Sequence, residues 1–250
     1  MIRGSYAATA GMITMLTRAQ QISNNIANVN TVGYREDQLR VTAFPQLLMN
    51  RLFSERGQPV VGSLVNGTAS ESTWIRFAQA PLRATDNPLD LAVQGTGLFA
   101  VQTAQGVRYT RDGGFRRDGQ NQLVTTRGDL VLDANLAPIS VPTGLVTVRG
   151  NGQVLVDDQV AGQVGLFDFV EPQQLVKVGN TLFEDQRGMA QPQAATGTTV
   201  RQGYLEQSNV DPARAMTDLM VAQRQYEAAA RMVQLQDEMT QRAANDIGRV

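Results

Sequence analysis

Acid–base or nucleophilic chemistry in this sequence would have to come from carboxylates, tyrosines, serines, threonines or the single lysine, Lys177, because the chain contains no cysteine and no histidine. One glycine pattern, Gly95-Thr96-Gly97-Leu98-Phe99-Ala100, matches the turn that holds a dinucleotide pyrophosphate. That chemistry needs a helix directly after the glycines. The next residues, Val101 to Gly106, predict a strand and a turn instead. We therefore expect a tight turn here and no nucleotide site.

Aspartates beside glycines form a second pattern that could carry chemistry. Asp118-Gly119-Gln120-Asn121 is similar to the start of a calcium loop, but the twelfth position holds Asp129 instead of glutamate and Gly119 is misplaced. A type I′ hairpin turn is the better interpretation. A pair of carboxylates that hydrolyses glycosides stays an open alternative. These aspartates stand at turns, however, and no aromatic platform for a sugar surrounds them, because Trp74 is the single tryptophan. We expect no catalytic residue, no cofactor and no metal ion.

The composition excludes several classes of protein. Without cysteine and histidine there is no disulfide, zinc site, iron–sulfur cluster or Ser-His-Asp relay. The 22 basic and 23 acidic residues give a net charge of −1 and form no basic run, so we expect no nucleic-acid partner. No stretch reaches the roughly 18 apolar residues of a membrane span, so we expect no direct membrane insertion. Ala8-Thr9-Ala10 is similar to a signal-peptide cleavage box, but the apolar segment before it is too short, so we expect no cleavage.

The order of elements predicts an α+β protein, in which long N- and C-terminal helices pair as a coiled coil and an antiparallel all-β domain is inserted between them. Residues 1–30 and 212–247 have helical patterns, whereas the glycine- and valine-rich middle has strands and turns. Residues 44–53 could form a short amphipathic helix. We expect a helical domain of residues 1–33 plus 206–250, an extended connector over 34–74 and a β-rich domain over 75–205.

The N-terminal helix carries apolar residues at alternating spacings of four and three, which is the a/d pattern of a coiled coil. The helix should end where Asn28 to Gly33 supply turn residues. We expect this stripe to be an assembly seam, made of Ala8, Met12, Met15, Ala19, Ile22, Ile26 and Val29.

The C-terminal helix has a clear start and two apolar rows. Asp211 can cap it, and Pro212 takes the first helical position, where its missing N–H costs nothing. Two adjacent rows make a wider apolar face than a two-stranded seam needs, which indicates more than one neighbour. The first row is Ala215, Leu219, Ala222, Tyr226, Ala229, Val233, Gln236, Thr240, Ala243 and Ile247, and the second is Ala228, Met232, Leu235 and Met239.

Four segments carry recognisable motifs. They are Ser23-Asn24-Asn25-Ile26-Ala27-Asn28-Val29-Asn30-Thr31-Val32-Gly33-Tyr34-Arg35, then 87–99, then Tyr109-Thr110-Arg111-Asp112-Gly113-Gly114-Phe115, then Gly203-Tyr204-Leu205-Glu206-Gln207-Ser208-Asn209-Val210-Asp211. In order and spacing they resemble the bacterial flagellar rod and hook family of axial proteins. The N-terminal motif residues taken from this resemblance are Asn24, Asn25, Asn28, Gly33 and Tyr34.

The resemblance implies a structural subunit of the flagellar basal-body rod. Such subunits are exported through the flagellar type III apparatus and polymerise helically through their terminal helices. The implied partners are further copies of the chain, other rod and hook subunits and the export apparatus. The length is similar to that of rod subunits rather than of the longer hook protein. Proximal and distal rod types share these motifs, so the position in the rod stays open.

The seams fit assembly for a physical reason. Alanine seams give close but weak contacts because little area is buried per residue, so further neighbours are needed to bury the helices fully. Head-to-tail contacts that do not close generate a filament. Two alternatives stay open at this point: a secreted β-domain binding module and a carboxylate-based hydrolase.

Overall fold

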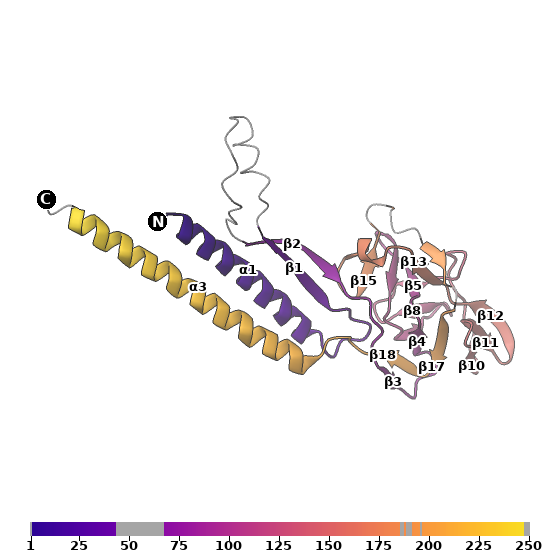
Figure 1. Cartoon of the computed structure of the whole chain (residues 1–250). Helices are drawn as coiled ribbons and strands as arrows, with labels where there is room; N and C mark the ends of the chain where they lie inside the picture. The colour runs from indigo at the N-terminus through magenta and orange to yellow at the C-terminus, as the bar shows by residue number, and fades with distance from the viewer. Residues whose placement is uncertain (1, 44–67, 186–187, 189–191, 196, 248–250) are drawn as a thin grey trace. The chain divides into compact units, whose positions relative to one another are not determined.

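The chain folds into two long helices and many short strands (Figure 1). Helix α1 spans Ile2–Ala27, helix α3 spans Pro212–Ile247, and a 3-10 turn spans Pro172–Gln174. The strands between the helices form antiparallel pairs, so the α+β class is confirmed. The computed structural model describes residues 2–43, 68–185, 188, 192–195 and 197–247.

The chain divides into two compact units. The helical unit consists of Met1–Ile26, Asp37–Trp74 and Asp211–Val250, and the β-rich unit consists of Ala27–Glu36 and Ile75–Val210. The coiled-coil pairing of the helices and the domain boundaries given above stay predictions.

The strands are short, as frequent turn residues predict. In chain order they are β1 (Asp37–Ala43), β2 (Thr68–Ile75), β3 (Leu82–Ala84), β4 (Leu91–Gln94), β5 (Leu98–Thr103), β6 (Gly106–Thr110), β7 (Phe115–Arg117), β8 (Leu123–Thr125), β9 (Leu130–Val131), β10 (Val146–Val148), β11 (Gln153–Val156), β12 (Gln159–Gln163), β13 (Leu166–Phe169), β14 (Val176–Lys177), β15 (Leu182–Glu184), β16 (Pro192–Ala194), β17 (Thr199–Gln202) and β18 (Tyr204–Glu206).

Strand β5 lies at the centre of the largest sheet. The sheet has the order β14-β15-β6-β5-β9-β8-β7, and β13 pairs with both β5 and β16. The continuous apolar run in β5 is typical of a strand that is buried on both faces. Leu98 and Ala100 accordingly lie in one hydrophobic cluster, and Phe99 and Val101 lie in another. Phe99 packs edge-to-face against Phe115, with ring centroids 5.0 Å apart. The core is therefore built on the two faces of this strand.

The other described strands form smaller sheets. Strand β17 pairs with β4, β18 pairs with β3, and β10, β11 and β12 form a separate three-stranded sheet. Strands β1 and β2 pair in the helical unit, so the described ends of the predicted connector are ordered strands. The suggested helix over residues 44–53 lies outside the described residues.

The two turn predictions have different outcomes. Gly95 and Gly97 lead into β5, so the glycine pattern makes a turn before a strand, as expected. The β7–β8 hairpin is also confirmed, but its type I′ assignment is wrong because Gly119 lacks the positive φ that such a turn requires. The loop spans residues 118–122 instead, and Asp118 Oδ1 accepts the N–H groups of Gln120 and Gln122 at 2.9 and 2.7 Å.

Both helix boundaries agree with their local signals. Helix α1 ends at Ala27, and turns follow as far as Gly33. At the start of α3, Asp211 Oδ1 accepts the N–H groups of Ala213 at 3.0 Å and Arg214 at 3.2 Å. Neither helix, over its described length, is long and apolar enough to cross a membrane.

Candidate functional site

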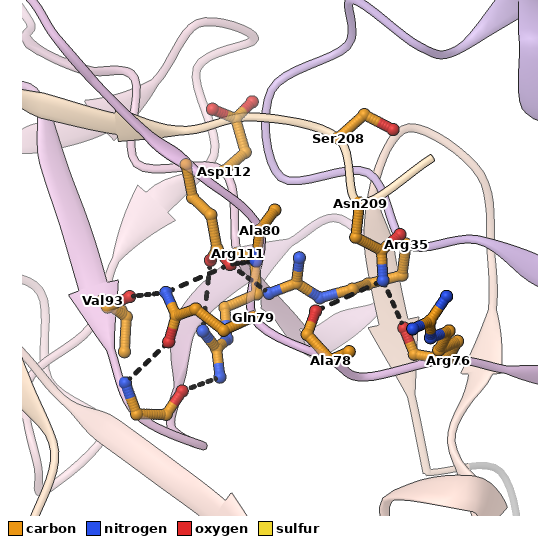
Figure 2. Close-up of polar contacts among 12 residues, drawn as sticks. Arg35, Arg76, Ala78, Gln79, Ala80, Val93, Arg111, Asp112, Ser208 and Asn209 are labelled. Carbon is orange, nitrogen blue, oxygen red and sulfur yellow. Dashed lines mark hydrogen bonds and ion pairs between the residues drawn. The ribbon is translucent and has the colours of Figure 1, made fainter. Parts of the chain in front are cut away.

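A buried charge network lies in the β-rich unit around Glu206, at the end of β18 (Figure 2). Arg35 Nη2 donates to Glu206 Oε1 at 2.8 Å, and Arg111 Nη1 donates to Oε2 at 3.1 Å. The three side chains are at most 1% exposed. Two guanidinium groups therefore share one carboxylate away from solvent. We call this group the Glu206 junction.

Neutral groups complete the Glu206 junction. The backbone N–H of Ala80 donates to the same Oε1 atom at 2.8 Å, and Gln79 Nε2 approaches it at 3.3 Å. Gln79 Oε1 accepts the N–H of Gly95 at 2.9 Å, and Arg111 Nη2 donates to the Gly95 carbonyl at 2.6 Å. The glycine that suggested a nucleotide turn thus presents its backbone groups to this network.

The electrostatics make both arginines depend on Glu206. Burial lowers the pKa of the Arg111 guanidinium to about 10, the Glu206 carboxylate opposes that shift, and the Arg35 charge adds to it. The Nε and Nη1 atoms of Arg35 are buried and have no hydrogen-bond partner among the described residues. A buried charge with few partners is stable only while its counter-ion is present.

A second set of contacts extends the junction through Asn209. Its Oδ1 accepts the N–H of Glu36 at 2.6 Å, and its Nδ2 donates to the carbonyls of Arg76 at 2.7 Å and Ala78 at 3.2 Å. The N–H of Gly33 also donates to the Glu206 carbonyl at 2.8 Å. These bonds tie together the segments that follow α1, follow β2 and precede α3 (Figure 2).

The single lysine reinforces the first of these segments. Lys177 Nζ, on β14, donates to the carbonyl of Arg35 and lies 4.0 Å from the centroid of the Tyr34 ring. An ammonium group over an aromatic face gains a cation–π interaction. The arrangement is structural: buried ion pairs and backbone contacts join segments far apart in the sequence.

Comparison with known proteins identifies these segments. Matching family models are described as flagella basal body rod protein (residues 6–35), flagellar hook protein FlgE/F/G D1 domain (92–156) and flagellar basal body rod FlgEFG protein C-terminal (201–246). The chain is 34% identical to the flagellar hook-basal body complex protein FlhO of Bacillus subtilis, over 100% of both chains. It is 34% identical to the flagellar basal-body rod protein FlgF of Caulobacter vibrioides, over 98% of each chain.

The chain belongs to the flagellar basal-body rod protein family. It is also 32% identical to the rod protein FlgG of Bacillus subtilis, over 98% of this chain and 99% of the relative. The resemblance drawn from the four motif segments is confirmed. The family is one of structural proteins of the basal body.

The N-terminal family motif divides between the two units. Asn25, in the helical unit, is buried, and its side-chain amide pairs with the backbone of Asp37. Its Nδ2 donates to the Asp37 carbonyl at 2.8 Å, and its Oδ1 accepts the Asp37 N–H at 3.1 Å. In the β-rich unit, Asn28 Oδ1 accepts from Thr31 Oγ1 at 3.2 Å. Gly33 and Tyr34 are buried at the junction, whereas Asn24 is exposed. The role of these residues in the family stays a prediction.

The seam residues are covered to different degrees. All seven N-terminal seam residues are half-buried, whereas Ile13 and Leu16, beside the seam, are 60% and 49% exposed. On α3, Ala222 is buried at 1% and most of its row is half-buried, but Tyr226 and Thr240 are exposed. The whole second row is exposed, and its members are Ala228, Met232, Leu235 and Met239. The Ile247 side chain lies outside the described residues.

Sequence reasoning missed the central residues of the junction. Arg35, Arg111 and Glu206 were not singled out, although each stands inside a family motif segment. The available signal was that each of three motif segments contains one of these charged residues. No local pattern pairs them, because Glu206 is separated by 171 positions from Arg35 and by 95 from Arg111.

Asp112 gives this rod-family protein a testable pH dependence. Burial raises the pKa of the Asp112 carboxyl, with Asp90 adding to the shift and Gly114 N–H and Arg127 opposing it. The folded state therefore holds this proton to higher pH than the unfolded state, and stability contributed here falls as pH rises through the two values. We expect Asp112→Asn to raise Tm relative to wild type at about pH 7 and the gap to close towards about pH 3. Thermal unfolding across that range tests this, and a gap that widens in acid would contradict it.

Proposed function

We propose that this protein is a structural subunit of the flagellar basal-body rod and polymerises helically through its terminal helices. The observation that supports this most strongly is the exposed second row of α3. Met232, Leu235 and Met239 are 55%, 56% and 63% exposed. An exposed apolar stripe of this length is typical of a protein–protein contact. Burying one such side chain fully contributes about 1.5–3 kcal/mol.

The same proposal assigns the half-buried seams. The α1 and α3 seams pair as a coiled coil within one copy, and the exposed α3 row packs on neighbouring copies. The partners are further copies and other rod and hook subunits, and the route is the flagellar type III export apparatus. A net charge of −1 favours dense packing of copies, because it removes long-range repulsion.

The Glu206 junction has a mechanical role in this proposal. It binds together the segments that follow α1 and precede α3, so a force on either helix passes into the β-rich unit through several bonds at once. Rigid, fully buried polar networks suit such a role because they specify one geometry.

The hydrolase alternative has no specific observation in its favour. Turn carboxylates that could have formed a catalytic pair accept backbone N–H groups instead: Asp133 Oδ1 from Asn135 and Ala137, and Asp157 Oδ1 from Leu145. Groups bonded in this way stabilise loops.

A charge placed on the exposed row tests the proposal. We expect Leu235→Glu to fold normally, because its side chain is already half exposed, but to be lost from basal bodies, because assembly would bury the new charge. The matched control is Gln241→Glu, an exposed position about 120° around α3 from Leu235. The measurement is the amount of each variant in basal bodies purified from a strain that lacks the wild-type chain. Equal incorporation of both variants would contradict the proposal.

A further inference from the structure

The three-stranded sheet of β10, β11 and β12 has charges of opposite sign at its two ends. It is an antiparallel meander, so residues 149–152 connect β10 to β11 at one end, and residues 157–158 connect β11 to β12 at the other. Strand β11 separates the two turns by about 13 Å, at about 3.3 Å per residue.

The first end is basic. Arg149 stands in the β10–β11 turn, and the carbonyl of the next residue, Gly150, accepts the N–H of Val200 at 2.8 Å. Arg201 therefore lies at the same end. Both arginine side chains are exposed, and neither forms an ion pair with a carboxylate of the described residues. Arg149 Nη1 donates a hydrogen bond to Gln153 Oε1 at 3.3 Å, and this acceptor is neutral.

The second end combines apolar side chains with carboxylates. Leu145 and Val160 are 75% and 62% exposed. Both lie at this end of the sheet, on either side of β11: the Leu145 carbonyl accepts the N–H of Asp157 at 3.0 Å, and Val160 pairs with Leu155 across the β11–β12 hairpin. Asp157 and Asp158 are exposed beside them, and neither has an ion-pair partner in the described part of the chain.

We propose that the acidic, apolar end of this sheet in one copy docks on the basic end in a second copy. This inference rests on the proposed function and adds the contact that the β-rich unit makes in the assembly. The two ends belong to one rigid sheet and cannot meet within a copy. Arginine pairs with carboxylates in a bidentate geometry, and Leu145 and Val160 supply apolar area around the pairs. Different surfaces meet in this head-to-tail contact, so it propagates along a filament.

A double variant removes the acidic charges without harming the turn. Asp157 and Asp158 both have positive φ, 49° and 63°, where Asn-Gly is preferred. In D157N/D158G the asparagine keeps an oxygen to accept the Leu145 N–H. We expect an unchanged or higher Tm and about tenfold less chain in purified basal bodies. The control is D118N, which also removes a carboxylate from a turn and keeps the side-chain oxygen that accepts hydrogen bonds. We expect this variant to be incorporated like wild type. Wild-type incorporation of D157N/D158G would overturn the inference.

Cross-linking identifies the surfaces that meet. The chain has no cysteine, so it can be cross-linked only at the cysteines that are introduced. In basal bodies that contain R149C/D158C, a short bis-maleimide should produce a ladder of covalent multimers, and R149C or D158C alone should produce none. The proposed contact would be wrong if R149C/D158C chains were incorporated but gave no ladder, or if D158C alone gave dimers. Either result would leave the rod assignment intact. Absence of the wild-type chain from purified basal bodies would overturn both.

Discussion

Replacing Glu206 by glutamine is expected to lower the free energy of unfolding of the β-rich unit by about 3–5 kcal/mol, the range for breaking a buried ion pair. The change leaves the Arg35 and Arg111 guanidinium groups buried without a counter-ion. The glutamine amide can accept one of the two arginine bonds, but its NH₂ group would face the other donor. Urea unfolding followed by circular dichroism measures the loss.

The matched control for this variant is Glu184→Gln. Glu184 pairs with Arg108 at 3.7 Å, and its side chain is 34% exposed, so solvent screens the pair. We expect a change within about 1 kcal/mol. If Glu206→Gln and Glu184→Gln had the same unfolding midpoint, the buried ion pairs of the Glu206 junction would contribute no more to stability than the partly exposed Glu184 pair.

Replacing Gly33 by alanine is expected to lower the free energy of unfolding by about 3–4 kcal/mol, which is the second large effect. Gly33 has φ +68°, and a Cβ built there would lie 2.4 Å from the Asp112 nitrogen and 2.6 Å from the Arg111 carbonyl carbon. Both are backbone atoms, so no side chain can turn aside. The Gly33 N–H also donates to the Glu206 carbonyl, and any shift that relieves the clash stretches that bond.

Gly11→Ala is the control for this substitution. A Cβ at Gly11 meets nothing within 4 Å, and the residue lies inside α1. Alanine in a helix interior is favoured over glycine by about 0.5–1 kcal/mol, so the control should be slightly more stable than wild type. A Gly33→Ala variant as stable as Gly11→Ala would mean that the close approach at Gly33 is not present in solution.

Local signals in this sequence predicted local structure well. Asp211 and Pro212 placed the start of α3, and the turn residues from Asn28 placed the end of α1. Each depends on residues a few positions apart. The β7–β8 turn was assigned to the wrong type because Asp118 closes a longer loop with its side chain, which an Asp-Gly pair does not reveal.

The charge network could not be derived in the same way. Arg35, Arg111 and Glu206 meet only because three distant segments pack together, and nothing in their own neighbourhoods selects them as partners. The motif resemblance pointed to the right segments but not to their contacts. Asn25 shows the difference: the motif marked it, and only the structure shows that it pairs with the Asp37 peptide.

Peptide mapping by mass spectrometry of hook–basal bodies, purified from the bacterium that encodes this chain, tests the rod assignment most directly. We expect peptides from the whole chain in the purified particles, together with an N-terminal peptide that begins ahead of Ala8-Thr9-Ala10. Absence of the chain from well-purified particles, or a mature terminus that starts after Ala10, would contradict a rod subunit delivered by type III export and favour a secreted binding module.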